Sequence, residues 1–174
     1  MELKPQDTLL ALKYWSLKLK GEESSVRAIA ESVAISASEV SKGTKRLVAS
    51  RLVVERNGSV FAESGALSEW LCYGVRYAYP QDSVGYGRGL PTSWNCPVLK
   101  SDIVPPAPPF VWPVPRGGVE GALIKPLHES VPFASSQNDD IYRAMSLIEA
   151  IRSGKPRELV IARDLLTRLI KGKP

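Results

Sequence analysis

Cysteine and histidine are scarce in this chain, which has two cysteines and one histidine in 174 residues. A structural zinc site needs about four cysteine or histidine ligands, so Cys72, Cys96 and His128 are too few to build one. Two cysteines also make a disulfide framework implausible, which agrees with a reducing compartment. We therefore expect no metal site and no cofactor.

Long apolar runs are missing as well. No stretch is long and apolar enough to span a membrane, which takes about 20 residues in a helix. The first residues, MELKPQDTLL, lack the basic region and apolar core of a signal peptide. The sequence thus predicts a cytoplasmic protein that does not enter the membrane.

The sequence also lacks a recognisable set of catalytic residues. His128 is followed by Glu129 and Ser130, but sequence neighbours rarely adopt the geometry of a triad. The segment GYGRG at 85–89 lacks the GK[ST] of a phosphate-binding loop. We therefore expect no enzymatic activity, and we interpret 73–97 as an aromatic-rich connection.

The composition is that of a folded protein, with 44% hydrophobic residues and a net charge of +5. A basic chain is compatible with a polyanionic partner, although the position of the charges matters more than their sum. Prolines divide the chain into three zones, because eleven of the fourteen lie between residues 80 and 133. This predicts one domain over 1–79 and a proline-rich extension with C-terminal helices over 80–174.

Helical periodicity dominates the first zone. Serine and aspartate at helix starts favour N-caps, so we assign one cap to Asp7 and another to Ser24 or Ser25. Gly43 is an unfavourable residue inside a helix and is compatible with a close helix crossing. The predicted helices are approximately Asp7–Lys20, Val26–Ser32 and Ser38–Ser50.

A β-hairpin follows in LVVERNGSVFAE, residues 52–63. Asn57-Gly58 separates two β-prone runs, and this pair favours a tight turn that needs positive φ at both central residues. We predict a further helix from about Gly65 to Tyr73. The order of three helices and a hairpin is the plan of a winged helix-turn-helix.

The run from Ser25 to Ala62 resembles the MarR-type winged-helix regulators. That family has a helix ending in an "ia-x-x-v-x-i-s" turn, a "[ST]-x-V-S-[RK]-x-x-x-x-L" recognition helix and a short "L-[VI]" strand. The resemblance covers about residues 7–63 and implies DNA binding and transcriptional regulation, with repression of the chain's own or a neighbouring operon. Its matching residues are Ile29-Ala30, Val33, Ile35-Ser36, Val40-Ser41-Lys42, Leu47 and Leu52-Val53.

A recognition helix must offer small polar and basic side chains to the major groove. We place the predicted contacts with double-stranded DNA on the third helix, its C-terminal end and the tip of the hairpin. These residues are Ser36, Ser38, Ser41, Lys42, Lys45, Arg46, Arg51, Arg56 and Asn57. The alternative is that the same surface is a solvated face, or that the winged helix is a protein-interaction module.

Two strands and two helices are predicted beyond the aromatic stretch. Val111–Val114 and Val119–Ile124 are expected to form a small hairpin, with Pro113 confining one strand to an edge. Asn138 or Asp139 caps a helix that Gly154-Lys155-Pro156 ends, and a last helix carries Leu159 to Leu169. The fold class is therefore α+β, with an N-terminal winged helix-turn-helix, a proline-rich irregular or β segment and a C-terminal helical hairpin.

Several short sequence segments after residue 80 are also similar to a group of uncharacterised bacterial winged-helix proteins. These segments include GLPTSW, PLHESVPFA and IYRAMSLIEAIRSGKPRELVIARDLL. This resemblance implies an antitoxin-like role, in which the extension contacts a partner toxin. Because paired half-sites favour two-fold symmetry, we also expect a homodimer. The basic C-terminal end is either a solvated face or a further nucleic-acid surface.

Overall fold

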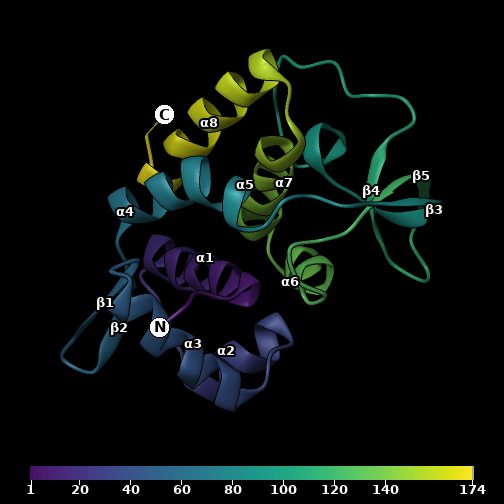
Figure 1. The fold of residues 1–174 in the computed structure, drawn as a ribbon. Coiled ribbons are helices and arrows are strands. Elements are labelled where there is room, and N and C mark those ends of the chain that lie inside the picture. Colours follow the sequence, from purple (N-terminus) through teal and green to yellow (C-terminus); the bar gives the residue numbers. More distant parts are fainter. Residues whose placement is uncertain (174) are drawn as a thin grey trace.

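The computed structural model describes residues 1–173 and confirms the α+β class (Figure 1). Helices form the body, a two-stranded hairpin lies at one side of it, and a small three-stranded sheet projects from the other. The helices are α1 (Pro5–Lys20), α2 (Val26–Val33), α3 (Ala37–Ala49), α4 (Ser64–Glu69), α5 (Val75–Ala78), α6 (Val131–Gln137), α7 (Asp139–Ser153) and α8 (Pro156–Lys171). The strands are β1 (Val53–Arg56), β2 (Ser59–Ala62), β3 (Ser83–Pro91), β4 (Phe110–Pro113) and β5 (Val119–Ile124).

The first helix begins earlier than predicted. Lys4 is its N-cap, and Asp7 lies in the first turn, where its Oδ2 accepts the Lys4 backbone N–H at 2.8 Å. The assignment of the cap to Asp7 was therefore wrong. Gly21 ends the helix with a φ of 64°, a conformation that glycine adopts without strain.

The hairpin is confirmed. β1 and β2 are antiparallel, with Arg56 opposite Ser59, so the loop contains two residues. Asn57 and Gly58 both have positive φ, 52° and 80°, as the Asn-Gly pair predicts. The following helical segment is longer than predicted, because a π-helical turn from Trp70 to Gly74 joins α4 to α5.

The small sheet was not predicted correctly. β4 and β5 run parallel, and each pairs antiparallel with β3, which covers the segment expected to be a connection. Glycines make this closure possible, since a Cβ on Gly89 would clash with the Trp112 backbone and one on Gly121 with the Pro109 backbone. The two predicted strands, 111–114 and 119–124, are therefore present as β4 and β5, but their pairing as a hairpin was wrong.

The C-terminal helical hairpin is confirmed. Asn138 caps α7, its Oδ1 accepting the backbone N–H groups of Asp140 and Ile141 at 2.9 and 3.1 Å. Gly154 and Lys155 separate α7 from α8, and the two helices pack against each other. Among residues 1–173, no helix is both long and apolar enough to cross a membrane.

One continuous cluster of buried side chains crosses the predicted boundary at residue 79. α1 packs against α3 and β2 on one side and against α7 on the other. Trp15 is fully buried, and its Nε1 donates to the Ile170 carbonyl near the end of α8 at 3.1 Å. The N-terminal helices and the C-terminal hairpin therefore share a core.

A buried ion pair links the small sheet to the helices. The Glu149 carboxylate on α7 is fully buried and accepts two hydrogen bonds from Arg152 Nη1, at 2.8 and 3.0 Å. Trp112 Nε1 on β4 and Gln81 Nε2 also donate to Glu149, at 3.1 and 2.8 Å. Arg152 further donates to the carbonyls of residues 79 and 80. The polar groups at this junction thus satisfy one another.

Candidate nucleic-acid interface

The outer face of α3 is a stripe of small polar and basic side chains. Ser38, Ser41, Lys42 and Lys45 recur at helical spacing, and all four are exposed. Neither lysine forms an ion pair with any residue from 1 to 173. We call these four residues the α3 stripe. Its charged groups are available to a partner in solution.

The inner face of α3 fixes the direction in which the stripe points. Val40 and Leu47 are fully buried, and α3 packs against α1, α2 and β1. Gly43 faces α1 so closely that a Cβ there would lie 2.8 Å from Asp7 Oδ1 and 2.9 Å from Leu10 Cδ2. This close crossing accounts for the glycine inside the helix.

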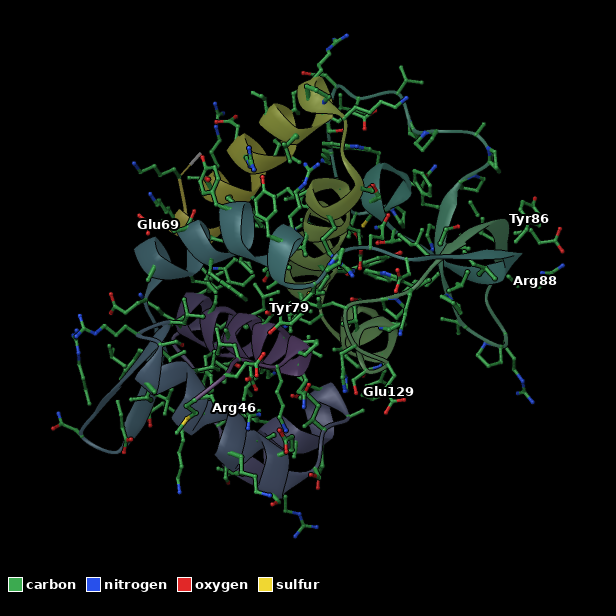
Figure 2. All side chains as sticks on the ribbon, in the orientation of Figure 1. Arg46, Glu69, Tyr79, Tyr86, Arg88 and Glu129 are labelled. Atoms are coloured by element: carbon green, nitrogen blue, oxygen red, sulfur yellow. The ribbon has the colours of Figure 1, made fainter. Side chains whose placement is uncertain are left out.

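Arg46 does not belong to the exposed surface, contrary to the prediction. Its side chain lies at the junction of α1 and α3 and is 8% exposed (Figure 2). The guanidinium donates to Asp7 at 2.7 and 2.8 Å and to Glu39 at 2.5 Å. The bond from Arg46 lowers the pKa of Glu39. With both carboxylates bound, Arg46 is not placed to contact a phosphate.

The serines at the start of α3 have different local roles. Ser36 is the N-cap, and its hydroxyl accepts the Glu39 backbone N–H at 3.2 Å. Ser41 donates its hydroxyl to the Ala37 carbonyl at 3.1 Å. Ser38 Oγ takes part in none of the hydrogen bonds formed within residues 1–173. All three serines are exposed, and among them only Ser38 has a hydroxyl that makes no hydrogen bond within residues 1–173.

Arg51 follows α3 directly. It adopts a left-handed conformation with φ of 61°, its N–H bonds the Val48 carbonyl, and the Leu52 N–H bonds the Leu47 carbonyl. This is a helix-ending motif that glycine usually occupies. The Arg51 side chain is exposed, and the residue lies between the end of α3 and the start of β1.

The hairpin tip carries Arg56 and Asn57, and both are exposed. Arg56 forms a loose ion pair with Glu63 at 3.9 Å, and its side chain keeps 70% exposure. Such an exposed pair contributes little and can exchange for another anion. Figure 1 shows the hairpin next to α3, while α8 lies on the other side of α1 from α3.

The turn between α2 and α3 is held from the C-terminal half. Ala34 ends α2 in the left-handed region with φ of 51°, and its carbonyl accepts the Ser130 hydroxyl at 2.8 Å. His128 lies nearby, with Nδ1 accepting the Ser130 N–H at 3.2 Å. Burial lowers the pKa of His128, which favours the neutral ring. Within residues 1–173, no cluster of three or more His, Cys, Asp or Glu side chains suits a metal ion.

Sequence reasoning missed Asp7 and Glu39 as partners of Arg46. A sequence signal exists for Glu39, because residues 39 and 46 are seven apart and share a helix face. No local signal exists for Asp7, which lies on another helix. Comparisons with protein-family models, curated proteins and solved structures gave no match to this chain, so its own residues have to carry any functional conclusion.

Proposed function

We propose that this chain binds double-stranded DNA as a winged helix-turn-helix and regulates transcription, most simply as a repressor of its own or a neighbouring operon. In this proposal α2 and α3 are the helix-turn-helix, α3 enters the major groove, and the β1–β2 hairpin is the wing. The MarR-type resemblance of residues 7–63 agrees with this order of elements.

The observation that carries the proposal is the composition of the α3 stripe. Its residues are serines and lysines, and the one carboxylate of α3, Glu39, is turned toward Arg46. A 13-residue helix is roughly 20 Å long, and the major groove, about 12 Å wide, admits such a helix. Ser38 and Ser41 are suited to base edges, while Lys42 and Lys45 are suited to base edges or phosphates.

The flanking charges suit the DNA backbone. Arg51 at the end of α3 and Arg56 at the wing tip are both exposed. In this proposal the two arginines contact phosphates at the edges of the groove, and Asn57 at the wing tip contacts the minor groove. These contacts supply salt-dependent affinity, whereas the stripe supplies sequence preference.

A single winged helix reads few base pairs, so we propose that the chain acts as a homodimer on two half-sites. Dimers of helix-turn-helix proteins bind half-sites about one helical turn apart. An operator with two-fold symmetry in the upstream region is the expected target.

The test is the double variant Lys42→Ala/Lys45→Ala, assayed for binding to the chain's own upstream DNA. We expect affinity to fall on the order of tenfold or more, and the slope of log K against log salt to lose about 0.9 for each phosphate contact removed. Both lysines are exposed, so the fold is expected to remain intact. Wild-type affinity in this variant would refute the assignment of α3.

A matched control is Lys171→Ala/Lys173→Ala. It removes the same charge from exposed positions at and just after the end of α8, which lies on the other side of α1 from α3. We expect it to leave DNA affinity nearly unchanged. Equal losses in the two double variants would mean that net charge, and not α3, determines binding.

A second candidate is an antitoxin-like module that binds a partner toxin. The observation in its favour is the projecting sheet, where Val84 and Tyr86 are 48% and 65% exposed. Figure 2 shows Tyr86 at the outer end of this sheet. Exposed apolar side chains at a projection are typical of protein contacts. Co-purification of the neighbouring gene product without any shift of the upstream DNA would favour this function. The variant Tyr86→Ala should then weaken the complex.

A further inference from the structure

A cleft of about 620 Å³ lies between the small sheet and α6. Its walls come from the end of β3, the turn between β4 and β5, α6, and Glu129 two residues before α6. Most of its lining is apolar, including Leu90, Pro113, Val119, Pro132 and Phe133. Small-molecule sites in proteins have volumes of about 300–1,000 Å³ and similar walls.

Among these residues, Phe133 most clearly indicates the kind of ligand that the cleft would bind. It lies on α6 and is 45% exposed, although its neighbours Val131 and Ala134 are buried in the core. A ligand that enters an apolar cleft can cover a large part of an aromatic ring at its mouth. The apolar area removed from water in this way contributes favourably to the free energy of binding. The ring thus favours an apolar group in the cleft.

Two opposite charges stand on different walls of this cleft. Arg116 lies on the β4–β5 turn, and Glu129 lies just before α6. Both are exposed, and within residues 1–173 neither forms an ion pair. An apolar cleft with one free cation and one free anion is complementary to a molecule that has an apolar body, a carboxylate and an ammonium group.

The same helix supports the proposed DNA-binding turn. Ser130 immediately precedes α6, is 5% exposed, and donates its hydroxyl to the Ala34 carbonyl between α2 and α3. α6 also packs against α2. A ligand that displaced Glu129 or Phe133 would thus act on the turn before α3 through this partly buried hydrogen bond.

We propose that this cleft binds a small apolar zwitterion, a hydrophobic amino acid or a short hydrophobic peptide, and that its occupancy changes DNA binding through α6. Arg116 holds the carboxylate, Glu129 holds the ammonium, and Phe133 covers the apolar side chain. The regulatory half of this statement rests on the proposed function, whereas the binding half does not.

Binding is tested first on the free protein by calorimetry and by chemical shifts of backbone amides. The probes are L-phenylalanine, the dipeptide of leucine and phenylalanine, and uncharged N-acetyl-L-phenylalanine amide. We expect at least one zwitterion to bind and to shift the amides of α6, and the uncharged probe to bind several-fold more weakly, since each exposed charge pair is worth up to about fivefold. Arg116→Gln and Glu129→Gln should each weaken binding by a similar factor. Phe133→Ala should weaken it by about tenfold through lost apolar contact.

Tyr86→Ala is the matched control for Phe133→Ala, because it also removes an exposed aromatic ring. Tyr86 lies on β3 but outside the cleft. Equal affinity for the uncharged probe, or no α6 shifts with any probe at millimolar concentration, would overturn the site. A dimeric wild type that Phe133→Asp converts to monomers, with no probe binding, would assign the cleft to a second copy instead.

The regulatory half is tested by repeating the DNA titration at saturating zwitterion. We expect about a fivefold or larger change in DNA affinity, and Ser130→Ala should abolish that change while leaving zwitterion binding intact. Zwitterion binding with unchanged DNA affinity would overturn the coupling through α6. Absence of DNA binding under all conditions would overturn the proposed function and leave the cleft assignment standing.

Discussion

Replacing Arg152 by methionine should destabilise the protein in a pH-dependent way. Methionine approximates the length of the arginine stem but removes its charge and the two hydrogen bonds that Arg152 donates to the Glu149 carboxylate. Glu149 would then be a fully buried carboxylate with only Trp112 and Gln81 as donors. Breaking a buried ion pair by removing one partner costs about 3–5 kcal/mol.

The sign of the pH effect follows from Glu149. Burial raises the pKa of Glu149, and Arg152 is the main opposing influence. Without Arg152 this pKa rises further, so the folded variant binds a proton at a pH where the unfolded chain is still ionised. Stability from this site is fully present below the unfolded pKa and is lost as pH rises through the folded pKa. The deficit of the variant relative to wild type should therefore shrink from pH 8 to pH 5.

Urea unfolding and thermal melts at several pH values between 5 and 8 measure this deficit. At pH 8 we expect a fall in Tm of roughly 6–20 °C, from about 2–4 °C for each kcal/mol in a chain of this size. The double variant Glu149→Gln/Arg152→Met should be more stable at pH 8 than Arg152→Met alone, because it buries no charge. Arg168→Met is the matched control, since its ion pair with Asp164 is about half exposed and should contribute under about 1 kcal/mol. A deficit that is the same at every pH would refute the reasoning.

Two substitutions test the backbone around α3. Gly43→Ala should lower the free energy of unfolding by about 1–3 kcal/mol despite the better helix propensity of alanine, because its Cβ would press on Asp7 and Leu10. Gly65→Ala makes the same change in open space on α4 and should be neutral or mildly stabilising, so a similar loss at both sites would contradict the close-crossing argument. Ala34→Gly should stabilise the protein by roughly 0.5–1 kcal/mol, because a left-handed alanine costs more than the added chain entropy of glycine. Denaturant melts measure all three, and a loss of stability in Ala34→Gly would show that its Cβ makes a needed contact.

Local patterns predicted much of the fold. Asn57-Gly58 determined the hairpin because positive φ at two successive positions is a local requirement. Ser25 and Asn138 were each among two predicted candidates for a cap, since a cap acts within three residues of itself. The exposed serines and lysines of α3 followed from helical spacing alone.

Long-range pairing could not be read from local patterns. β3 is rich in glycine, which has low strand propensity, and it forms a strand because β4 and β5 approach it closely. The orientation of Arg46 depends on Asp7, which is 39 positions away in the sequence. The exposed basic residues near Arg46, which are Lys42, Lys45 and Arg51, suggest that Arg46 shares their surface. Only its partner Asp7, on α1, shows that Arg46 is turned inward.

The position of α1 has a practical consequence for anyone who wishes to excise the amino-terminal half. Trp15 is covered by the last helix, and Ser16 accepts a hydrogen bond from Asn138 at 2.8 Å. A fragment that stops at residue 79 would leave the indole ring and its neighbours in water and would tend to aggregate. Point substitutions in the whole chain, and not truncations, are the sound way to assign roles to its parts.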